Sequence, residues 1–173
     1  MTPVQEFLAE RFGEAAMVVH AFRGDATVTV ARERILDALR AVKARPWAFE
    51  MLLDLTAWDR HPVEPRFEIV YHLLSLERTQ RLRIKTPVAG DDPVLPSAVE
   101  VFAGAEWFER EVWDLFGIRF EGHPDLRRIL MPDDWEGHPL RRDYPLTEEP
   151  VEFRGHVPKV PSEIVPHVPP RRR

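Results

Sequence analysis

Residues 106–143 hold the best candidates for chemistry in this chain of 173 residues. They include six carboxylates and two histidines, namely Glu109, Glu111, Asp114, Asp125, Asp133, Asp134, His123 and His138. Carboxylates beside a histidine can hold Mg²⁺ or Zn²⁺, or carry out acid–base catalysis. The two histidines, however, are fifteen residues apart, and no pair of metal ligands lies four residues apart on one helix. The spacing gives little support to a free-standing metal-dependent hydrolase, which stays open as an alternative.

The first of these groups should lie on a helix over residues 105–116. Glu106 and Arg110 are four residues apart, as are Arg110 and Asp114, so the three predict a ladder of ion pairs along one side. The expected apolar face comprises Phe108, Val112, Leu115 and Phe116. Charges in this arrangement suit a helix surface better than a catalytic centre.

The charge and the aromatic content of residues 100–144 indicate a binding surface. This stretch has eleven acidic and six basic residues, whereas the other 128 residues have eighteen of each. It also holds Phe102, Trp107, Phe108, Trp113, Phe116 and Phe120. Trp107 and Trp113 lie off the centre of the apolar face, where a partner surface would suit them better than water.

Loops should follow the helix, because glycine and proline interrupt residues 117–132 and 138–145 every few positions. Long ordered loops of this kind usually serve binding. Their arginines could form bidentate pairs with the carboxylates of a partner. The chain has no glycine-rich nucleotide-binding motif and no G-x-S-x-G motif. We therefore favour an interface or structural role over catalysis.

The elements that must position this region have clear sequence signals. We expect a helix over residues 3–12, a hairpin of strands 16–23 and 26–31, a helix over 32–44, strands near 49–55, 66–76 and 80–87, and one broken or two short helices within 96–117. Every second residue from Phe49 to Leu55 is apolar, which predicts a strand with one buried face. Residues 66–76 are apolar on both faces, as in an interior strand.

This order of elements predicts an α+β fold with a mostly antiparallel sheet and helices on one face, formed by residues 1–144. Residues 145–173 carry seven of the seventeen prolines and one aromatic residue, Phe153, without a repeating apolar face. They predict an extended proline-rich C-terminal tail that becomes ordered only on a partner.

Composition excludes several classes of function. The chain has no cysteine, which removes disulfides, thiol catalysis and cysteine-ligated zinc or iron–sulfur clusters. The formal charge of −5 argues against nucleic acid as the main partner. No apolar run approaches the ~18 residues that span a bilayer, and the N-terminus lacks the plan of a secretory signal. These features predict a soluble cytosolic protein.

A family resemblance rests on residues 105–145. Its motifs are the run Glu109-Arg110-Glu111-Val112-Trp113-Asp114-Leu115-Phe116, then His123, Arg127, Ile129 and Leu130, and the run over residues 129–145, which contains Gly137-His138-Pro139-Leu140-Arg141-Arg142-Asp143-Tyr144-Pro145. This pattern resembles the C-type subunit of the proton-pumping NADH–quinone oxidoreductase, which is the 30-kilodalton subunit of respiratory complex I. The residues before it, and the tail after it, carry no motif of their own.

The resemblance implies a subunit of the peripheral arm with no catalytic, cofactor-binding or metal site of its own. FMN, iron–sulfur clusters and quinone would be bound by partner subunits, and the assembly would pass electrons from NADH to quinone and pump protons. Relatives of the D-type and B-type subunits would lie beside this chain, and its tail would lie along the D-type partner. The chain would be a peripheral protein at the cytoplasmic face of the cell membrane, associated with the membrane only through the complex.

The motif residues are expected to contact a partner or to brace the loops. They are Glu109, Arg110, Glu111, Asp114, His123, Arg127, Arg141, Arg142, Asp143 and Tyr144. The four on the helix should hold it in register, and ion pairing within the chain is an equally open reading for each residue. Related subunits serve membrane-bound hydrogenase-type complexes, so the electron donor also stays open.

Overall fold

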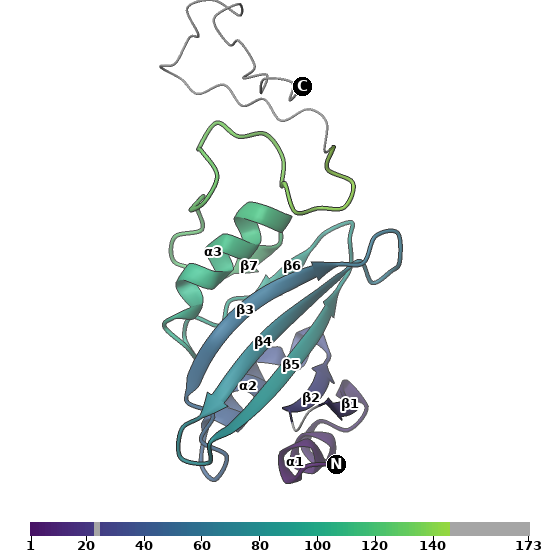
Figure 1. Ribbon diagram of the computed structural model, residues 1–173, viewed down its shortest axis with the longest axis vertical. Helices are drawn as coiled ribbons and strands as arrows, with labels where there is room; N and C mark the ends of the chain where they lie inside the picture. Colours follow the sequence, from purple (N-terminus) through teal and green to yellow (C-terminus); the bar gives the residue numbers. More distant parts are fainter. Residues whose placement is uncertain (23–24, 146–173) are drawn as a thin grey trace, which may run out of the picture.

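The computed structural model describes residues 1–22 and 25–145, so the expected tail lies outside the described residues from position 146 onward. Figure 1 shows the elements. In chain order they are α1 (Pro3–Phe12), a 3-10 turn (Gly13–Ala15), β1 (Ala16–Phe22), β2 (Asp25–Val30), a second 3-10 turn (Arg32–Arg34), α2 (Ile35–Lys43), β3 (Met51–Asp59), β4 (Phe67–Ser75), β5 (Gln80–Val88), β6 (Val94–Pro96), α3 (Ala105–Phe116) and β7 (Arg119–Glu121). The predicted α+β fold is confirmed.

The main sheet has five strands in the order β1-β2-β5-β4-β3. Three of its pairings, β1 with β2, β5 with β4 and β4 with β3, are antiparallel as expected. The fourth pairing, between β2 and β5, is parallel, so the sheet is mixed. This parallel pair arises because α2, β3 and β4 lie between β2 and β5 in the sequence, and a crossover of that length can return the chain in the same direction. A separate parallel pair joins β6 to β7.

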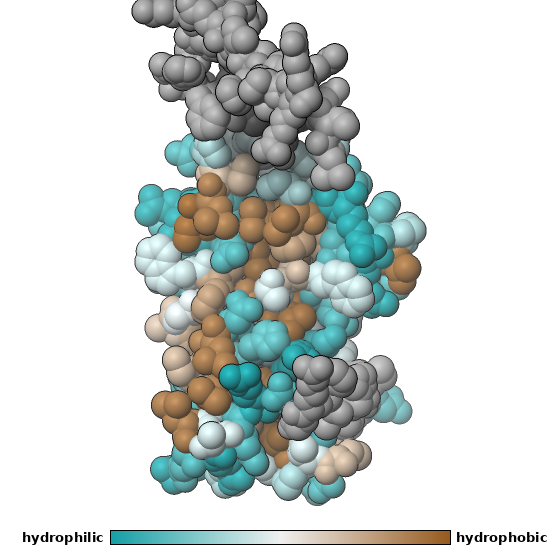
Figure 2. Space-filling view, viewed as in Figure 1, coloured by the Kyte–Doolittle hydropathy of each residue, from teal (hydrophilic) through white to brown (hydrophobic). Residues whose placement is uncertain are grey.

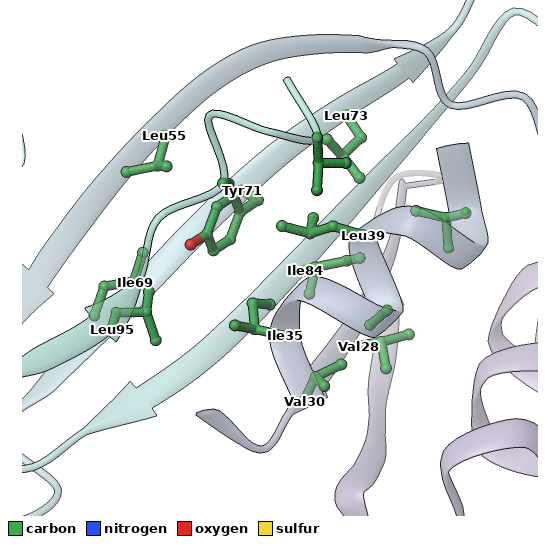
Figure 3. Packing of buried hydrophobic residues seen from close by; sticks show 14 of the residues in the cluster. Val28, Val30, Ile35, Leu39, Leu55, Ile69, Tyr71, Leu73, Ile84 and Leu95 are labelled. Carbon is green, nitrogen blue, oxygen red and sulfur yellow. The ribbon is translucent and has the colours of Figure 1, made fainter. Parts of the chain in front are cut away.

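The three helices contribute to one hydrophobic core on one face of the main sheet. Figure 3 shows Ile35 and Leu39 of α2 facing Tyr71 of β4 and Ile84 of β5, with Val28 of β2 beside them. All five side chains are completely buried. The interior position of β4, between β5 and β3, confirms the reading of an apolar strand over residues 66–76.

Strand β3 departs from the simple alternation that its sequence suggests. The register with β4 shifts between Leu52 and Asp54, which is an irregularity of the β-bulge type. An extra residue at a bulge reverses the faces on which the following side chains lie. Leu52 therefore packs against the core, whereas Met51 is 45% exposed. The expected single buried face over residues 49–55 is wrong for the first half of this strand.

The ends of the helices follow local signals. Thr2 caps α1, since its backbone N–H donates to the Gln5 side chain at 2.7 Å in a capping box. The region 96–117 contains a single α-helix, α3, preceded by a hydrogen-bonded turn in which the Phe102 N–H donates to the Ala98 carbonyl. Gly117 ends α3 with a φ of 72°, a conformation that favours glycine. Among the described residues, no helix has the length and apolar character needed to cross a membrane.

Candidate subunit interface

Residues 122–145 form one long irregular segment, here called the C-terminal loop, which follows β7. Figure 1 shows it above α3 and beyond the adjoining end of the sheet. The glycine and proline punctuation predicted such loops, and no helix or strand interrupts the segment. Its shape is set by polar contacts with α3 and with the end of the sheet.

Asp114 of α3 is the main anchor of the C-terminal loop. Its carboxylate is completely buried and accepts a hydrogen bond of 2.6 Å from Arg128 Nη1. It also accepts bonds from the backbone N–H groups of Ile129, Leu130 and Met131, at 3.1, 2.8 and 2.9 Å. Burial acts to raise the pKa of Asp114, but the bonds from Met131, Arg128 and their neighbours outweigh it and hold the pKa below its usual range. The loop is thus wrapped around a charged carboxylate.

Arg128 extends this anchor toward the later part of the loop. Its Nη2 atom donates to the carbonyl oxygens of Trp135 at 2.7 Å and Gly137 at 3.3 Å. His138 Nδ1 lies 2.9 Å from the carbonyl oxygen of Asp114 at the same end of α3. One buried arginine therefore connects the helix to two separate turns of the loop.

The predicted ladder of Glu106, Arg110 and Asp114 is wrong. Arg110 instead donates to the carbonyl oxygens of Arg127 at 3.2 Å and Arg128 at 3.0 Å, and no ion pair joins it to either acid within the described residues. The ladder assumed a helix side open to water. Because the C-terminal loop covers that side, the loop supplies fixed main-chain acceptors that replace the expected carboxylates.

Glu109 lies on the buried side of α3 and fixes the helix to the turn after β6. Its side chain is completely buried and accepts bonds of 2.6 Å from Ser97 Oγ and 2.6 Å from the Ala98 N–H. Burial raises the pKa of Glu109 to about 7, and the two hydrogen bonds offset only part of that increase. The expectation that Glu109 and Asp114 hold the helix in place agrees with these contacts. The buried face of α3 is consequently more polar than its apolar periodicity suggested.

A second anchor holds the end of the C-terminal loop to the main sheet. Arg66, just before β4, donates through Nε and Nη2 to Asp59 at 3.0 and 2.8 Å, and through Nη1 and Nη2 to Asp143 at 2.9 and 2.7 Å. Asp59 also accepts a bond of 2.8 Å from the Arg142 N–H. Burial acts to raise the pKa of Asp59, but these donors outweigh it and keep the pKa far below the usual range. Neither Arg66 nor Asp59 was predicted, because both lie far from the motif in the sequence.

The remaining predicted residues mostly brace the loop. His123 Nε2 lies 3.0 Å from the Glu106 carbonyl oxygen, and its Nδ1 accepts from the Asp125 N–H. Arg127 pairs with Asp125 at 2.8 Å on the surface. Glu111 is exposed and makes no hydrogen bond or ion pair with another described residue.

Arg141 and Tyr144 also bond within the chain. Arg141 Nε donates to the Phe116 carbonyl oxygen at 2.6 Å, and the Tyr144 hydroxyl donates to the Glu136 carbonyl oxygen at 3.3 Å. Burial lowers the pKa of Arg141, with a further contribution from the nearby Arg66 cation. Intrachain bonding thus applies to the predicted set apart from Glu111, and contact of these residues with a partner remains a prediction.

Large apolar side chains stay exposed on α3 and the C-terminal loop. Trp107 is 58% exposed, Leu130 59%, Leu140 52% and Ile129 37%; these four are called the loop surface below. Figure 2 shows hydrophobic side chains gathered over this part of the molecule. Exposed apolar residues on a rigidly held segment favour protein binding over a purely structural role.

The arrangement offers little for catalysis. Among residues 1–22 and 25–145, no three histidine or acidic side chains are grouped so that they could hold a metal ion. The buried carboxylates of Asp59, Glu109 and Asp114 are all engaged by donors of the chain itself. The fold and the loop surface define a class of protein, an α+β subunit that binds other proteins through a braced loop.

The family follows from comparison with known proteins. Residues 28–150 match the model of the family described as respiratory-chain NADH dehydrogenase, 30 Kd subunit, and the chain belongs to this family. The C-type subunit of the NADH-quinone oxidoreductase of Trichlorobacter lovleyi is 52% identical over 142 residues, which cover 82% of this chain and 87% of the relative. The combined C/D-type subunit of the NADH-quinone oxidoreductase of Pectobacterium atrosepticum is 42% identical over 151 residues, or 83% of this chain and 25% of the relative.

Two solved structures share the fold. A trypsin-resistant fragment of Nqo5, residues 1–134, has a TM-score of 0.64 and 33% identity, over 72% of this chain and all of the fragment. A chain of the membrane-bound sulfane sulfur reductase, an archaeal respiratory membrane complex, has a TM-score of 0.71 and 29% identity, over 82% of this chain and 84% of that chain. The resemblance drawn from residues 105–145 is confirmed.

Proposed function

We propose that this chain is a non-redox subunit of the peripheral arm of a proton-translocating NADH–quinone oxidoreductase. It supports the module in which partner subunits pass electrons from NADH, through FMN and iron–sulfur clusters, to quinone. The observation that carries this role is the loop surface, because its apolar side chains are exposed while buried charges hold the loop rigid. The absence of cysteine supports placing the clusters in other subunits.

The main partner in this proposal is a relative of the D-type subunit. Support comes from the relatives whose names join the letters C and D, so that one chain carries both designations. A relative of the B-type subunit is proposed as a further neighbour. The chain would be attached to the cytoplasmic face of the membrane only through the complex, and residues 145–173 would lie along the D-type partner.

A second candidate is the equivalent subunit of a complex with another electron donor, of the membrane-bound hydrogenase type. The structural likeness to a chain of a sulfane sulfur reductase supports it, since that complex is named for a different reaction. The two candidates share the scaffolding role of this chain and differ only in the partner subunits.

The test is recovery of the tagged full chain from its native cells in mild detergent, followed by mass spectrometry and an assay of NADH–quinone activity. Recovery with flavin- and cluster-bearing subunits and with NADH activity is the expected result. Recovery with nickel-hydrogenase-like subunits would move the chain to the second candidate. A monomer that binds Mg²⁺ or Zn²⁺ stoichiometrically would overturn both and reopen the hydrolase alternative.

A further inference from the structure

Arg66 joins two parts of the chain that are 77 residues apart in sequence. One edge of its guanidinium group forms a bidentate pair with Asp59, and another forms a bidentate pair with Asp143, through four bonds of 2.7–3.0 Å. Bidentate arginine–carboxylate pairs fix orientation as well as position, because the two planar groups must lie edge to edge. The Asp143 carboxylate is therefore held in one direction relative to the sheet.

The two halves of this contact differ in burial. The Asp59 side chain is 2% exposed and that of Arg66 is 12% exposed, whereas the Asp143 side chain is 46% exposed. Asp59 is the last residue of β3 and Arg66 immediately precedes β4, so the inner pair belongs to the end of the sheet. The outer pair joins this fixed base to the end of the C-terminal loop.

The last described residues are thus attached to the sheet at two successive positions. The Arg142 N–H donates to Asp59, and the Asp143 carboxylate accepts from Arg66. The next residues, Tyr144 and Pro145, complete the described chain. Proline fixes its own φ and restricts the residue before it, so little rotational freedom remains between Asp143 and Pro145.

We propose that Arg66 is a positioning residue, which fixes the direction in which the chain leaves the domain after Pro145 and so aims it at the D-type partner. This inference rests on the proposed function for the identity of the partner. A segment that already starts in its bound direction loses less conformational entropy on association. The expected benefit is therefore tighter assembly, without any contact between Arg66 and the partner.

The direct test uses the full chain, which has no native cysteine. Cysteines introduced at Val63, which is 51% exposed near Arg66, and at Thr147 carry a pair of spin labels whose distance distribution is measured by pulsed electron resonance. Asp143→Ala removes only the exposed arm and leaves Arg66 paired with Asp59. We expect a broader distance distribution in this variant. An unchanged distribution would overturn the proposal.

Asp37→Ala is the matched control. Asp37 has a similarly half-exposed side chain and pairs with Arg34 and Arg40, but it lies on α2. We expect this variant to keep the narrow distribution of the unmodified protein. Arg66→Lys is the second test variant, because lysine keeps the charge beside Asp59 but cannot form two bidentate pairs. It should broaden the distribution as Asp143→Ala does.

Partner recovery separates this inference from the proposed function. With equal folding by circular dichroism, Asp143→Ala should lower recovery of the D-type partner roughly fivefold, the scale expected for losing a preorganised segment. Recovery equal to that of Asp37→Ala would overturn the positioning role. If the unmodified chain recovers no such protein, the proposed function fails, and the spin-label distances still decide whether Arg66 directs the chain.

Discussion

The Asp114 carboxylate and the Arg128 guanidinium form a 2.6 Å ion pair, although the two side chains are only 0% and 13% exposed. A buried ion pair of this kind adds little net stability, because desolvation offsets the attraction between the charges. Losing one partner is costly, however, since the other charge is left buried and unpaired. Together with three backbone amides, this pair makes the shape of the C-terminal loop depend on one helix carboxylate.

The first prediction concerns this anchor. Asp114→Asn removes the charge while keeping the size of the side chain, and should lower the free energy of unfolding by about 3 kcal/mol. It should also open the loop to limited proteolysis around residues 128–131. Asp133→Asn, in an exposed position of the same loop, is the control. Equal denaturation midpoints and equal cleavage for both variants would show that Asp114 does not hold the loop.

The second prediction concerns the glycine that ends α3. A Cβ atom at Gly117 would lie 2.5 Å from His138 Cδ2 and 2.6 Å from Arg141 Nη2, and the φ of 72° is itself unfavourable for other residues. Gly117→Ala should lower the free energy of unfolding by roughly 2 kcal/mol and displace the loop. Gly104→Ala meets no atom within 4 Å and should be neutral. Thermal melts of both variants make the comparison, and a neutral Gly117→Ala would contradict it.

The third prediction concerns pH. The raised pKa of Glu109, about 7, means that the folded protein binds this proton more tightly than the unfolded chain. The stabilisation from the protonated form is complete below the unfolded pKa, and is lost as pH rises through the folded pKa. Its size is roughly 3 kcal/mol between pH 4.5 and 7. Asp59 and Asp114, whose pKa values are lowered, act in the opposite sense and lose their stabilisation as pH falls.

Glu109→Gln isolates the contribution of this group, since glutamine can still bond to Ser97 and Ala98. The variant should match the unmodified protein near pH 5 and be more stable near pH 8. Denaturant unfolding at several pH values measures both. A constant difference between the two proteins from pH 5 to 8 would mean that Glu109 titrates normally.

The fourth prediction concerns the loop surface. Leu130→Glu places a charge on an exposed apolar position, so it should leave the melting temperature unchanged and reduce co-purification with partner subunits at least tenfold. Leu76→Glu, which is equally exposed at 62% but follows β4, is the control. Native gels and NADH–quinone activity of the recovered complex provide the readout. Normal assembly with Leu130→Glu would remove the loop surface from the interface.

Predictions based on neighbouring residues succeeded where neighbours decide the structure. The capping box at Thr2, the stop of α3 at Gly117 and the interior strand over residues 66–76 depend on contacts within a few positions. The alternation from Phe49 to Leu55 failed, because the bulge that shifts it depends on pairing with β4. The parallel pairing of β2 with β5 likewise depends on the path of the chain between them.

The candidate site divides in the same way. The sequence by itself determined the motif, the aromatic and acidic character of residues 100–144 and the irregular loop, because residue type and glycine or proline spacing are local properties. Only the tertiary structure decided how the charges pair. Arg110 binds loop carbonyls rather than its helix neighbours, and Arg66 meets Asp143 across 77 residues. Burial under the loop makes an unpaired charge costly, so partners are chosen by proximity in space rather than by spacing along the helix.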